Sequence, residues 1–221
     1  MKPILVINFK TYEKATGKQA VKLAKACEEV AKKTKTKIWL AVQIADIYRV
    51  SEAVKLPVFS EHVDYQEPDS FTGSILVEDV KDNGAIGTLL NHSEHRLKLD
   101  VIEKTIKRCK KVKLKTLVCA ASVAEAKKIA KFKPDYIAYE APSLIGTGRS
   151  ISKFKHKTVK QFVEELKKID KKIIPLTGAG VSNGEDVKAA IDLGTHGALL
   201  ASAVTKAKNP KKVLLDLVRL I

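Results

Sequence analysis

A carboxylate at the end of a predicted strand is the residue with the clearest chemical potential in this sequence. The apolar run Tyr136–Tyr139 is followed by Glu140, and the next loop contains Pro142, Gly146 and Gly148. A carboxylate at the C-terminal end of a parallel strand can abstract a proton, and a glycine-containing loop can close over it and exclude water. The segment therefore predicts a proton-transfer site, although an ordinary turn from strand to helix has the same pattern.

Two other predicted strands end in residues that could act beside such a base. Asn8 and Lys10 follow the first apolar run, and His92 and Glu94 follow the fourth. One cation and one imidazole thus join the candidate base at the predicted strand ends, although a surface lysine and a structural histidine are the ordinary explanations of each. Ser93 and Glu94 also predict the start of a helix directly after His92. Amide groups at that helix N-terminus would disfavour protonation, so His92 is expected to stay neutral.

The last two predicted strands end in small residues. Gly178 and Gly180 follow the seventh strand, and Ala201 and Ser202 follow the eighth. Such turns leave backbone N–H groups free to bind phosphate, and these are the strands at which eight-stranded barrels commonly bind it. Taken singly, the lysine, the histidine and the glycine turns have ordinary structural explanations. Their joint placement at strand ends predicts a site for a phosphate-bearing substrate.

Strand-like runs alternate with helical patterns along the whole sequence. The runs cover residues 4–8, 37–42, 57–63, 85–91, 114–120, 136–140, 173–178 and 197–201. Helical patterns cover residues 18–33, 46–54, 77–82, 97–112, 123–131, 158–169, 185–193 and 211–220. The strand spacing of roughly 25 to 30 residues is that of a βα unit. We therefore predict an α/β fold, a single-domain (β/α)8 barrel in which residues 1–221 form one catalytic domain.

The composition fits a cytoplasmic enzyme with a buried parallel sheet. Of the 221 residues, 45% are hydrophobic but only 5% are aromatic, so the core is expected to consist mainly of aliphatic side chains. Cys27, Cys109 and Cys119 form no CxxC pair, which favours a reducing cytoplasmic location. The apolar run near the N-terminus is too short for a signal segment, and no run is long enough to span a membrane. No membrane partner is expected.

A formal net charge of +16 raises the question of nucleic-acid binding. The basic residues are mostly lysines that lie on or beside helical patterns, whereas specific nucleic-acid recognition relies on arginine. We therefore expect a solvated lysine surface and no nucleic-acid partner, with nucleic-acid binding kept as an alternative or second activity. The positive field would favour a small anionic substrate.

The strand-end residues lie in motifs that resemble those of the triosephosphate isomerase family, most closely its short archaeal branch. The motifs are Ile7-Asn-Phe-Lys10-Thr-Tyr12, Asn91-His-Ser-Glu-His-Arg96, Tyr139-Glu-Ala-Pro-Ser-Leu-Ile-Gly-Thr-Gly148, Gly178-Ala-Gly-Val-Ser182 and Leu200-Ala-Ser202. The resemblance covers essentially the whole chain. It implies a TIM barrel that interconverts D-glyceraldehyde 3-phosphate and dihydroxyacetone phosphate through an enediol(ate), in glycolysis and gluconeogenesis, with no metal or other cofactor.

The resemblance also implies a role for each catalytic residue. Glu140 would move the carbon-bound proton, and His92 would polarise the substrate oxygens as a neutral imidazole. Lys10 would bind substrate and offset the developing charge, Asn8 would help to position Lys10, and Glu94 would be a partner of Lys10.

The implied partners are triose phosphates and further copies of the same chain. The substrate-binding residues would be Asn8, Phe9, Lys10, Ile145, Gly146, Gly180, Ala201 and Ser202. Part of the segment 60–73 resembles a subunit-interface loop, but its first half departs from that pattern. A homodimer or a homotetramer is expected because shortened helices would expose apolar faces that an interface could cover. The alternative enzyme is another phosphate-binding barrel, a sugar-phosphate epimerase or aldolase. An epimerase would need converging metal ligands, and a Schiff-base aldolase would need lysine where this sequence has Glu140.

Overall fold

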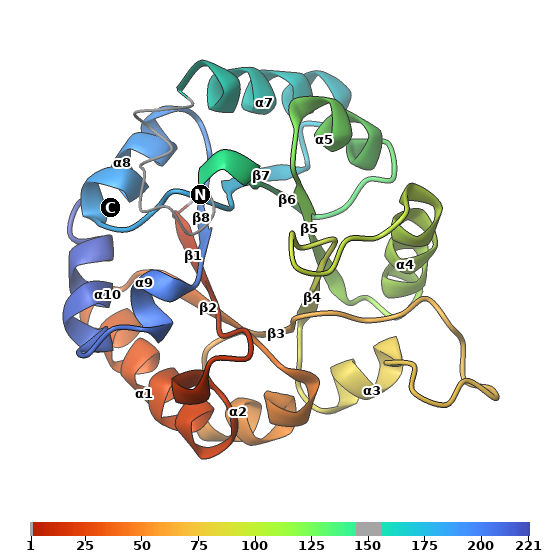
Figure 1. Cartoon of the computed structure of the whole chain (residues 1–221), viewed down its shortest axis with the longest axis horizontal. Helices are drawn as coiled ribbons and strands as arrows, with labels where there is room; N and C mark the ends of the chain where they lie inside the picture. Colours follow the sequence, from red (N-terminus) through yellow and green to blue (C-terminus); the bar gives the residue numbers. More distant parts are fainter. Residues whose placement is uncertain (1, 145–155) are drawn as a thin grey trace.

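The chain folds into a closed barrel of parallel strands surrounded by helices (Figure 1). The computed structural model describes residues 2–144 and 156–221. Its strands are β1 (Ile4–Asn8), β2 (Lys37–Val42), β3 (Val58–Ser60), β4 (Gly87–Leu90), β5 (Lys115–Ala120), β6 (Tyr136–Tyr139), β7 (Ile174–Thr177) and β8 (Gly197–Leu200). Neighbours pair in sequence order, and β8 pairs with β1 to close the sheet. The predicted eight-stranded barrel is thereby confirmed.

Helices follow the strands and cover the outside of the barrel. They are α1 (Gly17–Thr34), α2 (Ile47–Ala53), α3 (Val77–Asp82), α4 (Leu99–Lys111), α5 (Val123–Ala130), α7 (His156–Ile169), α8 (Gly184–Asp192), α9 (Ser202–Thr205) and α10 (Pro210–Val218). Short 3-10 turns occupy η1 (Glu13–Ala15), η2 (Ile44–Asp46) and η3 (Pro142–Leu144). Every predicted helix is present. Across the described ranges, no helix combines the length and apolar character required to traverse a bilayer.

The starts of α5, α8 and α10 follow capping rules that can be read from the sequence. Ser122 accepts a hydrogen bond from the amide of Glu125 at the start of α5, and Asn183 and Asn209 cap α8 and α10 in the same way. These side chains satisfy amides that have no partner inside the helix. The predicted helix start at Ser93 is wrong. Residues 93 and 94 form a turn, and α4 begins only at Leu99.

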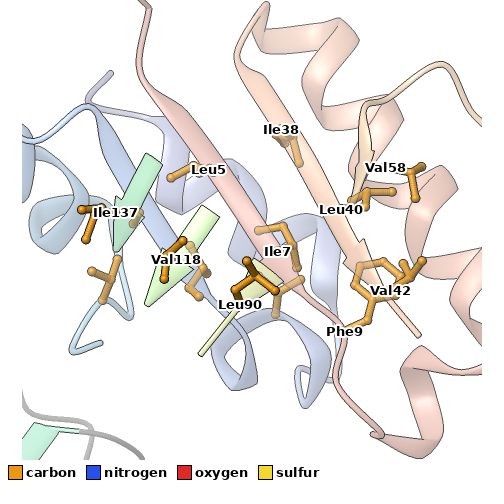
Figure 2. Packing of buried hydrophobic residues seen from close by; sticks show 14 of the residues in the cluster. Leu5, Ile7, Phe9, Ile38, Leu40, Val42, Val58, Leu90, Val118 and Ile137 are labelled. Carbon is orange, nitrogen blue, oxygen red and sulfur yellow. The ribbon is translucent and has the colours of Figure 1, made fainter. Parts of the chain in front are cut away.

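Side chains alternate along each strand between the barrel lumen and the layer under the helices. In β1, Ile4 and Val6 belong to the inner cluster, whereas Leu5 and Ile7 belong to the outer one, part of which Figure 2 shows. Successive strand residues point to opposite faces, so this alternation continues to the strand ends. It directs Asn8 inwards at the end of β1, and by the same rule a residue just after β6 faces the lumen.

The lumen is filled by large side chains despite the low aromatic content. The ring of Trp39 on β2 stacks on Phe59 with centroids 5.1 Å apart and meets Tyr136 of β6 edge-on at 5.2 Å. Gly87 makes room for these rings, because a Cβ there would lie 2.3 Å from the Phe59 ring. The barrel interior is therefore a packed core, and space for a ligand is found at its C-terminal rim.

Candidate active site

A cleft of about 580 Å³ opens at the C-terminal ends of the strands. Among the residues that line it are Asn8, Lys10, His92, Glu140, Gly180, Ala201 and Ser202. The structure thus brings together most of the residues that the sequence singled out. Glu94 lines an adjoining cavity of about 250 Å³, which shares Asn8, Lys10 and His92 with the cleft.

Three predicted substrate-binding residues are not found in the cleft. Ile145 and Gly146 lie outside the described residues. Phe9 is described, and its side chain is fully buried in the layer between the strands and the helices (Figure 2). Its side chain therefore does not line the cleft, and substrate binding by Phe9 stays a prediction that concerns its backbone. The cause is the two-residue alternation, which turns Phe9 outwards together with Leu5 and Ile7.

Glu140 is a buried carboxyl group whose two oxygens both have partners. Its Oε1 lies 3.2 Å from Nε2 of His92, and its Oε2 accepts a hydrogen bond from the amide of Ser93 at 3.0 Å. Only 2% of the residue is exposed. This burial raises the pKa of Glu140 to about 7, although the Ser93 amide and the charge of Lys10 act in the opposite direction. A carboxylate with such a pKa is well matched to proton transfer near neutral pH.

Small and buried neighbours fix the position of Glu140. The amide of Gly178 donates to the carbonyl of Tyr139 at 2.7 Å, and a Cβ at Gly178 would lie 2.6 Å from Cγ of Glu140. Glycine is therefore the residue that lets β7 approach the carboxyl group. Cys119 of β5 lies beside it in the lumen, and burial followed by the Glu140 charge raises the pKa of this thiol well above its usual value. Sequence reasoning missed Cys119, although its inward position follows from the strand alternation.

His92 is held with a defined tautomer. The amide of Glu94 donates to Nδ1 at 3.2 Å, so the ring proton lies on Nε2, which faces Oε1 of Glu140. Burial, together with the charge of Lys10, lowers the pKa of His92 to about 4. This lowered pKa favours a neutral ring at physiological pH. The amide that faces the ring belongs to a turn, which the hydrogen bond from His95 N–H to the His92 carbonyl closes at 2.8 Å, and not to the predicted start of a helix.

Lys10 is held in a strained backbone conformation. Its φ of 50° lies in the left-handed region, which costs a residue with a side chain roughly 1–2 kcal/mol. The Lys10 amide donates to Oδ1 of Asn8 at 3.1 Å, and Nζ forms an ion pair with Oε1 of Glu94 at 2.8 Å. The sequence-based expectation that Asn8 and Glu94 contact Lys10 thus agrees with the geometry. These contacts direct the ammonium group towards the cleft.

The wall formed by the ends of β7 and β8 consists mainly of turns and small side chains. Gly180 has a φ of 67°, which glycine tolerates readily, and Ala201 precedes the short helix α9. The first amides of a helix have no partner within it and can bind an anion. Lys206, whose Nζ lies 5.0 Å from the centre of the Tyr12 ring, lines the same wall. Sequence reasoning missed Lys206 because it lies within a lysine-rich stretch without a motif.

Comparison with known proteins identifies the family. The model of the triosephosphate isomerase family matches residues 3–221. The chain belongs to the triosephosphate isomerase family. It is 45% identical to the triosephosphate isomerase of Methanobrevibacter smithii, over 98% of this chain and 97% of that protein. It is 46% identical to that of Methanosarcina barkeri, over 99% of both chains. The predicted archaeal type is confirmed, and the family decides against the epimerase and aldolase alternatives.

Solved structures agree on the architecture. The triosephosphate isomerase of Bartonella henselae has a TM-score of 0.74 against this chain, at 15% sequence identity, and covers 100% of it. At that identity the likeness shows the fold alone. Within residues 2–144 and 156–221, no cluster of three or more histidine, cysteine, aspartate or glutamate side chains is placed to bind a metal ion.

Proposed function

We propose that Glu140, His92 and Lys10 carry out the interconversion of D-glyceraldehyde 3-phosphate and dihydroxyacetone phosphate, the activity of the family to which the chain belongs. The observation that carries this proposal is the contact between the Glu140 carboxyl and the neutral His92 ring in one cleft. It joins a base of suitable pKa to a donor for the substrate oxygens. The chain is accordingly an isomerase of glycolysis and gluconeogenesis.

Each group has a separate task in the proposed reaction. Glu140 removes the proton from the carbon next to the carbonyl and returns it to the neighbouring carbon of the enediol(ate). His92 donates from Nε2 to the substrate oxygen, while Nδ1 keeps the Glu94 amide as its donor. Lys10 offsets the negative charge that grows on those oxygens. Asn8 and Glu94 position Lys10 through the contacts described above.

The phosphate group is proposed to bind along the wall formed by the ends of β7 and β8. Gly180, Ala201 and Ser202 line this part of the cleft, and Lys206 supplies positive charge at its edge. Ile145 and Gly146, on the loop after β6, are proposed to complete the site. Backbone amides suit this task because they bind a dianion without the conformational freedom of a long side chain.

We further propose that the chain self-associates, as a homodimer or a homotetramer, and acts in the cytoplasm as one catalytic domain over residues 1–221. The segment between β3 and α3 extends away from the barrel (Figure 1), and Phe71 on it is 48% exposed. Ile44 and Tyr48 are also exposed, at 45% and 62%. Exposed large apolar side chains are typical of contact surfaces. Sedimentation of the parent chain and of the Phe71→Ser variant tests the proposed self-association. If both chains sediment as monomers, the proposal is contradicted.

A coupled assay tests the proposed function. The purified chain is given glyceraldehyde 3-phosphate in the presence of excess EDTA, and the dihydroxyacetone phosphate formed is reduced by a second enzyme with NADH. We expect turnover that EDTA leaves unchanged and that Glu140→Gln abolishes. Activity that needs an added divalent ion, or that survives Glu140→Gln, would contradict the proposed chemistry.

A further inference from the structure

A second acidic side chain, Glu61, lies close to Lys10. Glu61 directly follows β3, where its amide donates to the carbonyl of Val42 at 3.1 Å and fixes its position next to β2. It lines the cavity of about 250 Å³ together with Lys10 and Glu94. Its Oε1 is buried and has no hydrogen-bond partner among the described residues. A buried carboxyl oxygen without a partner is costly, and more so when it carries charge.

The surroundings of Glu61 compensate a negative charge only in part, through Lys10. The titratable or charged groups that face it or share its cavity are Lys10, Asp46, His62, His92, Glu94 and His95. His62 and His95 stack with ring centroids 4.3 Å apart, and Asp46 already binds the Gly17 amide at 2.8 Å. Lys10 is therefore the cation that acts on Glu61, and it is already paired with Glu94.

We propose that Glu61 is a positioning residue that acts through Lys10. While Glu61 is neutral, Lys10 stays available to the substrate. When Glu61 ionises, its negative charge opposes substrate binding. This inference rests on the proposed function. With Glu61 neutral, Glu94 is the carboxylate that pairs with Lys10. An ionised Glu61 places a second negative charge beside Lys10, which offsets the lysine charge and repels an anionic substrate.

The ionisation of Glu61 falls in the range in which an enzyme works. Burial, together with the charge of Glu94, raises the pKa of Glu61 to about 7, although the backbone of Lys10 and its ammonium charge act to lower it. The ionised fraction grows as the pH rises through 7. The catalytic efficiency of the parent should therefore fall with pH relative to a chain that cannot ionise at this position.

The test compares kcat/KM of the parent and of Glu61→Gln between pH 6 and 8.5. Taking the ratio of the two cancels the ionisation of the substrate phosphate and of Glu140. We expect a parent-to-variant ratio near one at pH 6 that falls about three- to tenfold by pH 8.5, mainly through KM, as for one added like charge near a bound anion. Glu103→Gln on the exposed face of α4, where Glu103 pairs with Lys107, removes the same charge and should give a constant ratio.

A second measurement does not depend on the variant or on activity. Carbon-13 NMR of glutamate carboxyl groups in the parent should show a group that titrates near pH 7 and is absent from Glu61→Gln. Inorganic sulfate, whose charge is constant over this range, should raise that midpoint, because binding and protonation are reciprocally linked. Chloride at equal ionic strength is the control.

The outcomes separate the two proposals. A constant or rising parent-to-variant ratio, a Glu61 carboxyl that titrates near its ordinary value, or a midpoint that sulfate leaves unchanged would each overturn the role of Glu61. The chain could lack isomerase activity while Glu61 still titrates near pH 7 and responds to sulfate. That result would overturn the proposed function and leave the coupling of Glu61 to anion binding intact.

Discussion

Glu140 and Glu61 are two carboxyl groups at the rim of one barrel whose pKa values burial raises alike, but whose side-chain oxygens differ in their contacts. Burial raises the pKa of each to about 7. Oε2 of Glu140 accepts a hydrogen bond from the Ser93 amide and Oε1 lies 3.2 Å from Nε2 of His92, whereas Oε1 of Glu61 has no partner among the described residues. A raised pKa therefore does not by itself identify a base. Contacts that fix the carboxyl in one orientation distinguish a group that transfers protons from one that acts through its charge.

Lys10 connects the two carboxyl groups, because its charge lowers the pKa of both. Lys10→Ala should reduce kcat/KM by on the order of 1,000-fold, the upper end of the loss seen when one donor to a developing oxyanion is removed. Added methylammonium should restore part of the activity. A steady-state assay with and without methylammonium measures both effects.

Lys133→Ala is the matched control for the backbone strain in Lys10→Ala. Lys133 is an exposed lysine before β6 with a φ of 57°, close to the 50° of Lys10. Both variants place alanine in the left-handed region at similar cost, but only Lys10 lines the cleft. Equal activity losses in the two variants, or unchanged binding of phosphate-bearing inhibitors by Lys10→Ala, would show that Lys10 has no direct role.

Shortening Glu140 tests whether proton transfer depends on a fixed position of its carboxyl group. Glu140→Asp withdraws the carboxyl by roughly an ångström and should lower kcat on the order of 100-fold, with little change in the free energy of unfolding. Glu103→Asp on the surface of α4 is the control and should retain full activity. A Glu140→Asp variant with near-parental kcat would remove Glu140 from the role of base.

The sequence predicted the Glu140 side of the site better than the Lys10 side. Two-residue alternation along the strands accounts for the inward direction of Glu140 and for the outward direction of the Phe9 side chain, which the motif alone does not indicate. The conformations at Lys10 and Asn91, with φ of 50° and 58°, interrupt that alternation and cannot be read from residue types. The burial of Glu61 depends on loops after β1 and β4 that are distant in sequence, so no local pattern indicated it.

Gly178 offers a finer test of how tightly Glu140 is positioned. A Cβ at this residue would lie 2.6 Å from Cγ of Glu140, which is too close for real Cβ atoms, so Gly178→Ala must displace the Glu140 side chain. We expect about a tenfold loss of kcat, smaller than for Glu140→Asp, and destabilisation of about 1–3 kcal/mol from overpacking. Kinetics and denaturant unfolding on the same sample separate the two effects. Parental kcat in a destabilised variant would show that Glu140 tolerates displacement.

His92 is adjacent to both carboxyl groups. Of the expected effects, the change in the protonation of His92 with pH is the smallest. It contacts Oε1 of Glu140 and shares the cavity of Glu61. Burial and the Lys10 charge lower the pKa of His92 to about 4. Because the folded pKa lies below the unfolded value of about 6.5, the neutral ring favours the folded state above pH 6.5, and that contribution is lost as the pH falls from 6.5 towards 4.

We therefore expect nitrogen NMR of ring-labelled protein to show no protonation of His92 between about pH 5 and 8, with the proton on Nε2 throughout. The exposed His156 on α7 supplies the reference signal in the same sample. The ionisation of Glu61 near pH 7 should shift the His92 signals slightly without adding a proton, because a nearby charge perturbs the ring but the Glu94 amide keeps Nδ1 as an acceptor. A full titration of His92 in this range would contradict both its neutral role and the idea that burial governs the groups at this rim.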